Sequence, residues 1–492
     1  MDVVLLLLLV LPLAAALACA LVPLPLCRAL TAACGAAGFG LAVALVPAAA
    51  HGEIGYLRFL RVDAVSAVFL LATGFLYGTV AVYSAGYLPD GRAGRAQARY
   101  ARRMWAGLNL FAWAMLAAPM MSNLGLLWVA VEVTTIVSAL LVAVENTAGA
   151  AEAAWKYVLL ASTGLALALL ATIFAYYAGA HVLGQSYDLG FAQLLAVAGR
   201  LPHTAVQLSF VLAVVGFGTK MGLVPVHTWL PDAHSEAPTP VSALLSGSLL
   251  AISFYAILRF YQVAEAALGP RFPRNVLLVF GVASLLLAAL YLFGQRDIKR
   301  LLAYSSIEHM GIVTIGVSFG APVALAGVML HVLAHAAAKA NAFMGAGVFT
   351  VKYGTKQMAT MRGALDLLPW SGPLFLLAVF ALSALPPSGI FRSEFQIVAG
   401  GLDSGDYATA AILVVLATVA FFGLTTSTTR ILFTPAPRSL SAAAATGRGE
   451  PSAWMVVPAV AGIAALFILG LHPPGELTGL ISRAVTELEA AR

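Results

Sequence analysis

Charged side chains are scarce in this chain of 492 residues. Asp, Glu, Lys and Arg make up 10% of the sequence, hydrophobic residues make up 61%, and the mean hydropathy is +0.94. Soluble domains carry about a quarter charged residues, so a soluble protein is excluded and a lipid bilayer is expected around the chain. The net charge of +6 is scattered through the loops, which does not indicate a nucleic-acid partner.

Cysteine is also rare, and its spacing excludes redox chemistry by this chain. Cys19, Cys27 and Cys34 lie near one another without a CxxC motif, so neither an iron–sulfur cluster nor a zinc site is indicated. No glycine-rich loop that would hold a phosphate precedes a helix. We therefore expect no cofactor, and any electron transfer would take place in partner subunits.

Long apolar runs are what the sequence has in abundance. Runs of about 20 residues recur from end to end, and roughly fourteen of them meet the length of a transmembrane helix. The sequence therefore predicts an all-α polytopic membrane protein. Basic residues gather in alternate loops, as at Arg95–Arg103, Arg296–Arg300 and Lys352–Arg362. The positive-inside rule puts these loops inside and both termini outside.

Two of the predicted spans contain residues that interrupt a helix. Residues 205–234 include Gly218, Gly222 and Pro225, and residues 371–400 include Pro386 and Pro387. We expect breaks near 218–225 and 385–390. A broken helix at membrane depth is tolerated inside protein or along a hydrated cavity, so paired breaks indicate a transport site.

Ionisable groups recur along the chain at nearly one period. The spacing is 176 residues from Glu132 to Glu308 and 174 residues from Lys220 to Glu394. This period predicts two inverted five-helix repeats, because an odd number of helices reverses the direction of entry. The expected division is residues 1–104 for the first three helices, 105–262 and 263–434 for the repeats, and 435–492 for the final helix and tail.

Charged groups within a span cost roughly 2.5–3.5 kcal/mol each, so they indicate function. The candidates are Glu132, Lys156, Lys220, Lys339 and Glu394. Glu132 has two interpretations: a structural ion pair with Lys156 or Lys220, or a switch in a proton relay. We prefer the relay, in which the carboxylate approaches a buried lysine and leaves it.

His331, His335 and Lys339 follow one another at intervals of four residues, on one helix face about 12 Å long. This pattern is typical of a proton relay. A metal site is the rival interpretation, but the adjacent lysine disfavours a divalent ion and no third ligand is evident, so we expect no metal. A further alternative is that backbone carbonyls satisfy both histidines.

Four other residues are weaker candidates. His227 and His234 flank the first break, where they either transfer protons or cap loop backbone. Glu308 either tunes the region of Lys339 or faces Arg296, Lys299 or Arg300 near the inner surface. Arg392 either holds Glu394 ionised or contacts a partner subunit. Asp63 is expected to pair with Arg61 or Arg58 at a helix entrance.

Three stretches together resemble a known family. They are KMGLVPVHTWLPDAHSEAPTPVSALLSG at 220–247, QRDIKRLLAYSSIEHMG at 295–311 and HVLAHAAAKANAFMGAG at 331–347. They resemble the antiporter-like membrane subunits of respiratory complex I, multisubunit cation/proton antiporters and energy-converting hydrogenases, and most of all the F subunit of hydrogenase-4. The resemblance implies a fourteen-helix fold in the cytoplasmic membrane of a bacterium or archaeon.

The resemblance also implies roles for particular residues. Glu132 matches the essential glutamate of the fifth helix, Lys220 and Lys339 match the lysines of the broken and eleventh helices, and Glu394 matches the acid of the twelfth. Several relatives carry a lysine on the eighth helix where this chain has Ala251. The connection between Lys220 and Lys339 then needs water, the two histidines or another route.

The expected function is that of a proton-translocating subunit without a redox centre in an oxidoreductase complex. Its partners would be other membrane subunits and, through them, a peripheral redox arm. One alternative is a Na⁺ or K⁺/proton antiporter, with Asp232 and Glu236 as cation ligands. Others are a structural membrane anchor and a membrane subunit of an inorganic-carbon uptake complex.

Overall fold

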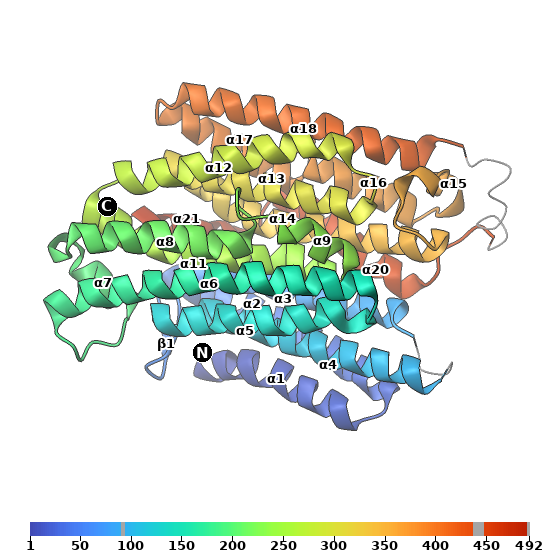
Figure 1. The fold of residues 1–492 in the computed structure, drawn as a ribbon, viewed down its shortest axis with the longest axis horizontal. Helices are drawn as coiled ribbons and strands as arrows, with labels where there is room; N and C mark the ends of the chain where they lie inside the picture. Colours follow the sequence, from blue (N-terminus) through green and yellow to red (C-terminus); the bar gives the residue numbers. More distant parts are fainter. Residues whose placement is uncertain (90–93, 436–446, 490–492) are drawn as a thin grey trace.

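The computed structural model describes residues 1–89, 94–435 and 447–489, and almost all of this part is helical (Figure 1). The N-terminal part extends to η1, which lies beyond residue 105, where the first predicted repeat begins. Its elements are α1 (Asp2–Leu21), α2 (Leu24–His51), β1 (Ile54–Tyr56), β2 (Leu60–Val62), α3 (Ala64–Tyr87), α4 (Arg95–Ala117) and η1 (Ala118–Met120). The two strands form an antiparallel hairpin with Ile54 opposite Val62. The sequence did not predict this hairpin.

The next elements carry the first broken helix. They are α5 (Leu124–Val142), η2 (Ala143–Glu145), α6 (Ala148–Leu183), α7 (Phe191–Ala196), η3 (Ala198–Arg200), α8 (His203–Met221), α9 (Trp229–Glu236), α10 (Thr239–Leu244), the π-helical turn η4 (Leu245–Leu249) and α11 (Leu250–Leu268). Polar side chains start several of these helices, as Asn123 does for α5 and Thr147 for α6.

The remaining elements carry the second broken helix. They are α12 (Arg271–Tyr291), η5 (Leu292–Gly294), α13 (Ile298–Phe319), α14 (Pro322–Tyr353), η6 (Met358–Thr360), α15 (Ala364–Leu367), α16 (Ser371–Leu382), α17 (Gly389–Asp403), α18 (Tyr407–Phe433), α20 (Ala453–Leu471) and α21 (Gly475–Glu489). Residues 436–446 and 490–492 of the predicted C-terminal region lie outside the described residues.

Both predicted breaks are confirmed. α8 ends at Met221, and Gly222 takes a φ of +88° in the left-handed region that suits glycine. A Cβ on Gly222 would also lie 2.4 Å from the side chain of Leu230, so the chain folds back closely there. The second break separates α16 from α17, between Leu382 and Gly389.

Eleven helices of the described part are long and apolar enough to cross a membrane. The other three expected spans correspond to α4 and α13, which carry charged residues, and to the interrupted pair α16 and α17. The fourteen predicted spans therefore have counterparts. The first loop lies at Val22–Pro23, earlier than predicted, and the amphipathic helix α21 was not expected.

Burial separates central helices from peripheral ones. The most apolar stretch of the span Thr239–Leu268 is wholly buried and that of α14 is 89% buried, whereas in α18 the share is 28%. The centre of the bundle is therefore α11 and α14, and α18 presents its surface to lipid or to neighbouring subunits. The start of α1 and the end of α21 lie toward the same end of the bundle, opposite the start of α4 (Figure 1).

Small residues let neighbouring helices approach closely at the first break. A Cβ on Gly216 of α8 would lie 2.5 Å from the backbone nitrogen of Ala168 and 2.7 Å from the carbonyl oxygen of Gly164, both on α6. Such contacts bring backbones together in membranes, where hydrophobic burial gives little drive for association. This packing sets the position of Lys220, one turn further along α8.

Candidate functional site

Lys220 and Glu132 lie near each other on α8 and α5. The Lys220 ammonium is fully buried and donates hydrogen bonds to the carbonyl oxygen of Val131, 2.9 Å away, and to the hydroxyl of Thr135. Glu132 interacts electrostatically with Lys220, but its Oε2 has no hydrogen-bond partner among the described residues. The carboxylate is thus close to the lysine without being bound to it, as a movable switch requires.

Lys339 and Glu308 form a second buried pair, on α14 and α13. Lys339 has no exposed surface, Glu308 is 4% exposed, and the two charges interact electrostatically. The Lys339 ammonium donates to the carbonyl oxygen of Leu302, 3.0 Å away. Of the two placements expected for Glu308, the structure has the one beside Lys339.

A histidine from α13 completes a cluster with the two predicted histidines of α14. His309 Nδ1 lies 3.2 Å from His331 Nε2, and its ring centroid lies 5.2 Å from that of His335. The sequence offered a signal for His309, since it follows Glu308 directly, but that signal was missed. Backbone carbonyls do not hold His335, because neither ring nitrogen has a partner among the described residues.

The hydrogen bonds around His331 fix where its proton lies. The Ser393 hydroxyl donates to the carbonyl oxygen of Ile390 at 2.8 Å, so its oxygen accepts from His331 Nδ1–H at 2.9 Å. His331 Nε2 then carries a lone pair and accepts the hydrogen bond from His309 Nδ1–H. The two rings are therefore aligned to pass a proton.

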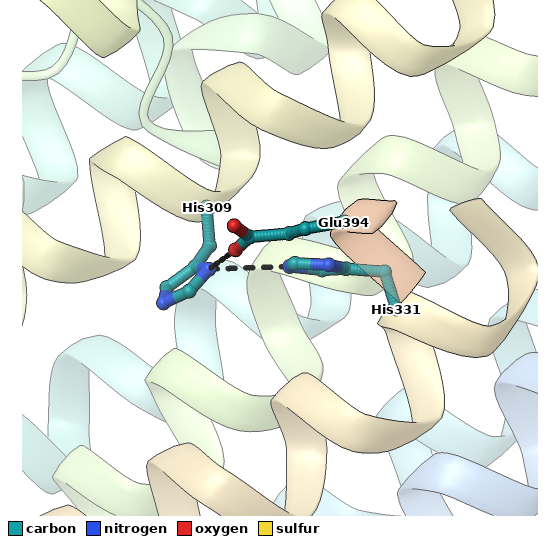
Figure 2. A group of neighbouring side chains, drawn as sticks. All are labelled: His309, His331 and Glu394. Carbon is teal, nitrogen blue, oxygen red and sulfur yellow. Dashed lines mark hydrogen bonds and ion pairs between the residues drawn. The ribbon is translucent and has the colours of Figure 1, made fainter. Parts of the chain in front are cut away.

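Glu394 of α17 closes the cluster on its other side. Its Oε1 lies 3.7 Å from His309 Nδ1, and Figure 2 shows the carboxylate beside the His309 ring. Glu394 also lines a cavity of about 410 Å³, together with Glu308 and Ser383. The carboxylate can exchange protons with both the histidines and that cavity.

The eighth span, which carries Ala251, contributes Ser246 to a polar path from Lys339. Ser306 of α13 donates to the carbonyl oxygen of Leu302, the same oxygen that accepts from Lys339. Its hydroxyl lies 2.8 Å from that of Ser246, in the π-helical turn η4. A polar path therefore runs from Lys339 into the eighth span, and π-turns often mark functional sites.

A polar cavity of about 440 Å³ opens beside the first break, lined by Glu145, Glu236, Lys299 and Lys356 among others. The buried Lys299 ammonium donates to the carbonyl oxygens of Ser235 and Ala237. His234 lies beyond, fully buried, with electrostatic interactions with both Lys299 and Lys339. Neither nitrogen of its ring has a partner among the described residues, so it does not cap loop backbone.

Three other predicted residues lie elsewhere. Lys156 does not pair with Glu132: its half-exposed side chain contacts Glu152 at 2.7 Å and Asp232 at 3.1 Å, because it lies near the start of α6. Arg392 donates to the carbonyl oxygen of Gly470 at 3.3 Å and forms no ion pair with Glu394 in the described chain.

His227 is buried beside the first break. Its Nδ1 has no hydrogen-bond partner among residues 1–89, 94–435 and 447–489. The structure does not bring it into the cluster of His309 and His331.

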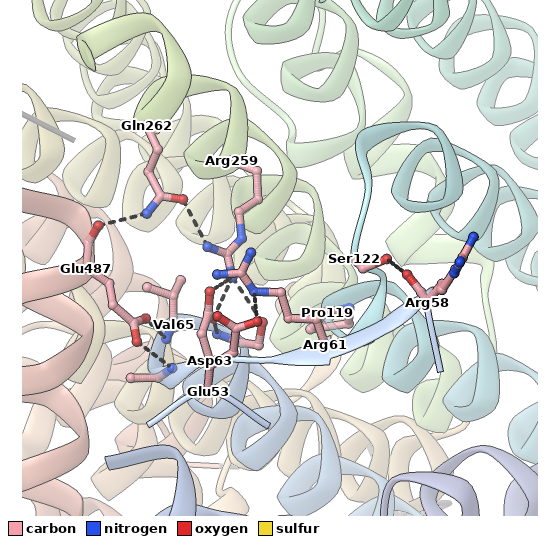
Figure 3. A network of polar contacts seen from close by, with 12 residues as sticks. Glu53, Arg58, Arg61, Asp63, Val65, Pro119, Ser122, Arg259, Gln262 and Glu487 are labelled. Atoms are coloured by element: carbon pink, nitrogen blue, oxygen red, sulfur yellow. Dashed lines mark hydrogen bonds and ion pairs between the residues drawn. The ribbon is translucent and has the colours of Figure 1, made fainter. Parts of the chain in front are cut away.

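A separate buried ion pair ties the start of α3 to α11 (Figure 3). Arg259 donates to both carboxylate oxygens of Asp63, at 2.5 and 2.7 Å, and the predicted pairing with Arg61 or Arg58 is wrong. Arg61 instead contacts Glu53 at 2.7 Å. Burial raises the pKa of Asp63, but the Arg259 guanidinium and the hydrogen bond from the Ser66 amide, together with the charge of Arg61, more than offset this, so the pKa lies below its ordinary value.

The model of the NADH:quinone oxidoreductase/Mrp antiporter transmembrane family matches residues 121–420. The chain belongs to this family. The match spans both broken helices and the residues of the Lys220–Glu132 and Lys339–Glu308 pairs. The family predicted from residues 220–247, 295–311 and 331–347 is therefore confirmed.

Relatives agree with this assignment. A hydrogenase-4 component F homolog of Methylacidiphilum infernorum is 36% identical over 365 residues, which cover 73% of this antiporter-like chain and 76% of the relative. The NADH-quinone oxidoreductase subunit N of Desulforudis audaxviator is 30% identical over 437 residues, which cover 87% and 84%. The chain is thus an antiporter-like, multi-pass membrane subunit.

Solved structures share the fold. A chain of the Mrp complex from Dietzia sp. DQ12-45-1b superposes with a TM-score of 0.84 at 22% identity, over 100% of both chains. A chain of respiratory complex I from Thermus thermophilus superposes with a TM-score of 0.82 at 23% identity, over 99% of this chain and 100% of the other. The predicted antiporter-like fold is therefore confirmed.

Proposed function

We propose that this chain conducts protons across the membrane as a subunit of a redox-driven complex. The observation that carries the proposal is the series of buried ionisable groups from the cavity at the first break to the cavity at the second. Burying such groups is expensive, and in membranes they mark proton and ion pathways. Helix packing alone does not require three buried histidines to cluster between Lys339 and Glu394.

Protons enter at the cavity lined by Glu145 and Glu236 and reach Lys299. His234 is the step between Lys299 and Lys339, since its fully buried ring lies within electrostatic range of both lysines. Because its two nitrogens are unpartnered in the described chain, it is free to accept a proton on one and release one from the other. Lys339 is the central carrier, with Glu308 stabilising its charged form.

Protons leave Lys339 through the histidine cluster. His335 lies one helical turn from Lys339, and its ring adjoins those of His309 and His331. A proton arriving from His335 binds His309 at Nε2, which has no partner among the described residues, and the ring then releases its Nδ1 proton to Glu394. From Glu394 the proton reaches the cavity at the second break. Lys220 and Glu132 act before Lys339 in the path. When Glu132 moves toward Lys220 it stabilises the protonated lysine, and when it moves away the neutral lysine is favoured.

The names of relatives support the kind of complex. The similar proteins are a hydrogenase-4 component and a quinone oxidoreductase subunit, so we propose neighbouring membrane subunits and a peripheral redox arm as partners. The two broken helices support a division into repeats at 105–262 and 263–434. The basic loops at one end of the bundle support termini outside the cytoplasmic membrane.

A cation antiporter is the second candidate, and the contacts of its expected ligands disfavour it. Asp232 already pairs with Lys156 at 3.1 Å and with Arg300 at 2.9 Å, and Glu236 pairs with Lys356 at 2.7 Å. Carboxylates neutralised by basic side chains are poor ligands for Na⁺ or K⁺. The positions proposed for a cation site therefore lack free negative charge.

Proton uptake by inverted membrane vesicles tests the proposal. The complex is driven by its own electron donor while a pH-sensitive dye reports acidification, with sodium absent or in excess. We expect Lys339→Ala to remove most of the acidification that this chain contributes, and sodium to have no effect. Lys352→Ala is the matched control. Lys352 lies at the end of α14, outside the proposed path, and donates to the carbonyl oxygens of Gly447 and Gly449.

Two results would contradict the proposal. Unchanged acidification by an assembled Lys339→Ala complex would favour a membrane anchor. Acidification that depends on sodium would favour the antiporter. Assembly is checked by purifying each variant complex and comparing its subunits with those of the wild type.

A further inference from the structure

We propose that His309, His331 and Glu394 form a binding site for a divalent transition-metal ion of the Zn²⁺ class, and that an ion bound there blocks the proton path. Metal binding does not depend on proton conduction. The block does rest on the proposed function.

The first argument is the spacing of the three ligand atoms. His309 Nδ1 lies 3.2 Å from His331 Nε2 and 3.7 Å from Glu394 Oε1, and all three atoms lie within 4.8 Å of one another. Zinc bonds of about 2.0–2.1 Å place neighbouring ligands of a tetrahedral ion roughly 3.3 Å apart. Small movements of the side chains, with the His309 proton transferred from Nδ1 to Nε2, which has no partner among the described residues, would therefore complete the coordination (Figure 2).

The second argument is the orientation of His331. Its Nδ1–H is held by the Ser393 hydroxyl oxygen at 2.9 Å, which leaves the lone pair of Nε2 directed toward His309. Histidines that bind metals almost always donate their other N–H to a neighbouring acceptor in this way. Ser393 is fully buried, so water does not compete for this bond.

The third argument is that His335 makes no hydrogen bond with the described residues. Its side chain is 1% exposed, and neither nitrogen has a partner among the described residues. Its ring centroid lies 5.2 Å from that of His309 and 6.1 Å from that of His331. A buried imidazole with a free lone pair is a suitable fourth ligand, and binding a metal would satisfy it.

The sequence alone argued against a metal for two reasons, and the structure answers both. The missing third ligand is supplied by α13 and α17, which bring His309 and Glu394 to the histidines of α14. The charge of Lys339 is offset by Glu308, which interacts with it electrostatically. Glu394 then adds one negative charge, and the cavity of about 410 Å³ that it lines gives an ion access.

An ion at this site would use the lone pairs that carry protons in the proposed path. His309 Nδ1 releases its proton to Glu394 in the relay, and a bound metal would occupy that nitrogen. The same ion would hold Glu394, the outlet of the cluster. The chain would therefore be inhibited by low concentrations of a transition metal and indifferent to Mg²⁺, which prefers oxygen ligands.

Zinc binding by the purified full chain tests the site. The chain carries a tag without histidine, and the exposed His51, His181, His203 and His472 are replaced by Gln to remove surface binding. After incubation with ZnCl₂ and desalting, the metal is measured by mass spectrometry and its ligands by X-ray absorption. We expect retained zinc with nitrogen and oxygen ligands at about 2.0 Å.

Three variants in this background decide the outcome. His331→Ala should lose the retained zinc, whereas His227→Ala, which changes a buried histidine outside the cluster, should keep it. Ser393→Ala should weaken binding by roughly tenfold, because it removes the acceptor that orients His331. This milder change preserves a test if His331→Ala does not fold.

No retained zinc in the background protein would overturn the site, as would equal retention by the background, His331→Ala and Ser393→Ala proteins. Inhibition is measured separately in vesicles, with ZnCl₂ added to a wild-type complex that pumps. Retained zinc without inhibition would leave the site standing and refute the block. Loss of pumping in Lys339→Ala without any effect on zinc would separate the two proposals.

Discussion

Replacing Asp63 by Asn should destabilise the folded chain strongly, because it removes the negative partner of a buried guanidinium. Arg259 is 1% exposed and donates to both oxygens of Asp63. Breaking a buried ion pair by removing one partner costs about 3–5 kcal/mol. Asn preserves the volume and still accepts the hydrogen bond from the Ser66 amide, so packing contributes little to the loss.

The remaining contacts of Arg259 place the expected loss of stability in Asp63→Asn at the lower end of that range. Its guanidinium also donates to Gln262 at 2.9 Å and lies 4.7 Å from the Phe191 ring and 4.8 Å from the Tyr255 ring. Each ring contact is worth about 0.5–2 kcal/mol when desolvated and stays in the variant. We expect the free energy of unfolding to fall by about 3 kcal/mol.

Reversible unfolding of the chain in mixed micelles by added SDS measures this change. Glu53→Gln is the matched control, because Glu53 pairs with Arg61 at a partly exposed position where an ion pair contributes about 0–1 kcal/mol. A second variant, Asp63→Ala with Arg259→Met, removes both charges and should recover much of the stability. A loss in Asp63→Asn no larger than in Glu53→Gln would refute the reasoning.

The pH dependence provides an independent check of the same pair. The pKa of the Asp63 carboxyl is lower in the folded chain than its ordinary value of about 3.9, because Arg259, the Ser66 amide and Arg61 together outweigh the effect of burial. Its stabilisation is therefore complete above that ordinary value and is lost as the pH falls through the lower, folded value. The difference between wild type and Asp63→Asn should be constant from about pH 5 to 8.

Two further predictions concern close helix packing and the serine path. Gly216→Ala should lower the free energy of unfolding by about 1–3 kcal/mol, because the new methyl group would meet the α6 backbone. Gly199→Ala is the control, since open space surrounds Gly199, and it should leave the stability unchanged. Equal effects of the two substitutions would contradict this. Ser306→Ala should slow proton uptake by about tenfold, because it removes the hydroxyl that links Ser246 with the carbonyl oxygen of Leu302, while Ser318→Ala on the same helix should leave the rate unchanged. Equal rates in these two variants would exclude the serine path.

The sequence predicted the spans and the breaks because both depend on local composition. An apolar run of sufficient length has few alternatives to a helix in lipid, and Gly222, Pro225 and Pro386 interrupt a helix wherever they occur. The helix starts were harder to place, since capping residues such as Asn123 and Thr147 differ little from other polar residues in a loop. The β hairpin and α21 were not predicted, because their sequences lack the long apolar run by which the spans were found.

Pairings between distant segments were not predictable in the same way. Asp63 and Arg259 lie 196 residues apart, and only the packing of α3 against α11 brings them together. The sequence instead favoured the arginines nearest in the chain. The position of His309 directly after Glu308 was a local signal, but its partners on α14 and α17 follow at distances that no local period reveals, so the cluster was not predicted.

The residues of the proposed path were partly predictable. Lys220, Lys339 and Glu394 are charged within apolar runs, and this contrast with their neighbours in the sequence singles them out. Lys156 met the same criterion, yet it lies near the start of α6 and pairs with Glu152 and Asp232. Depth in the membrane depends on where a helix begins, and local composition defines that point poorly.

Protons translocated per electron pair, measured on the purified complex in proteoliposomes, test proton conduction most directly. Glu394→Gln removes the carboxylate that receives the His309 proton, and Asp366→Asn changes an exposed carboxylate on α15 as the control. We expect the ratio to fall in Glu394→Gln, with electron transfer retained when the membrane is made permeable to protons. A ratio equal to that of the wild type, in a fully assembled Glu394→Gln complex, would contradict the proposed path.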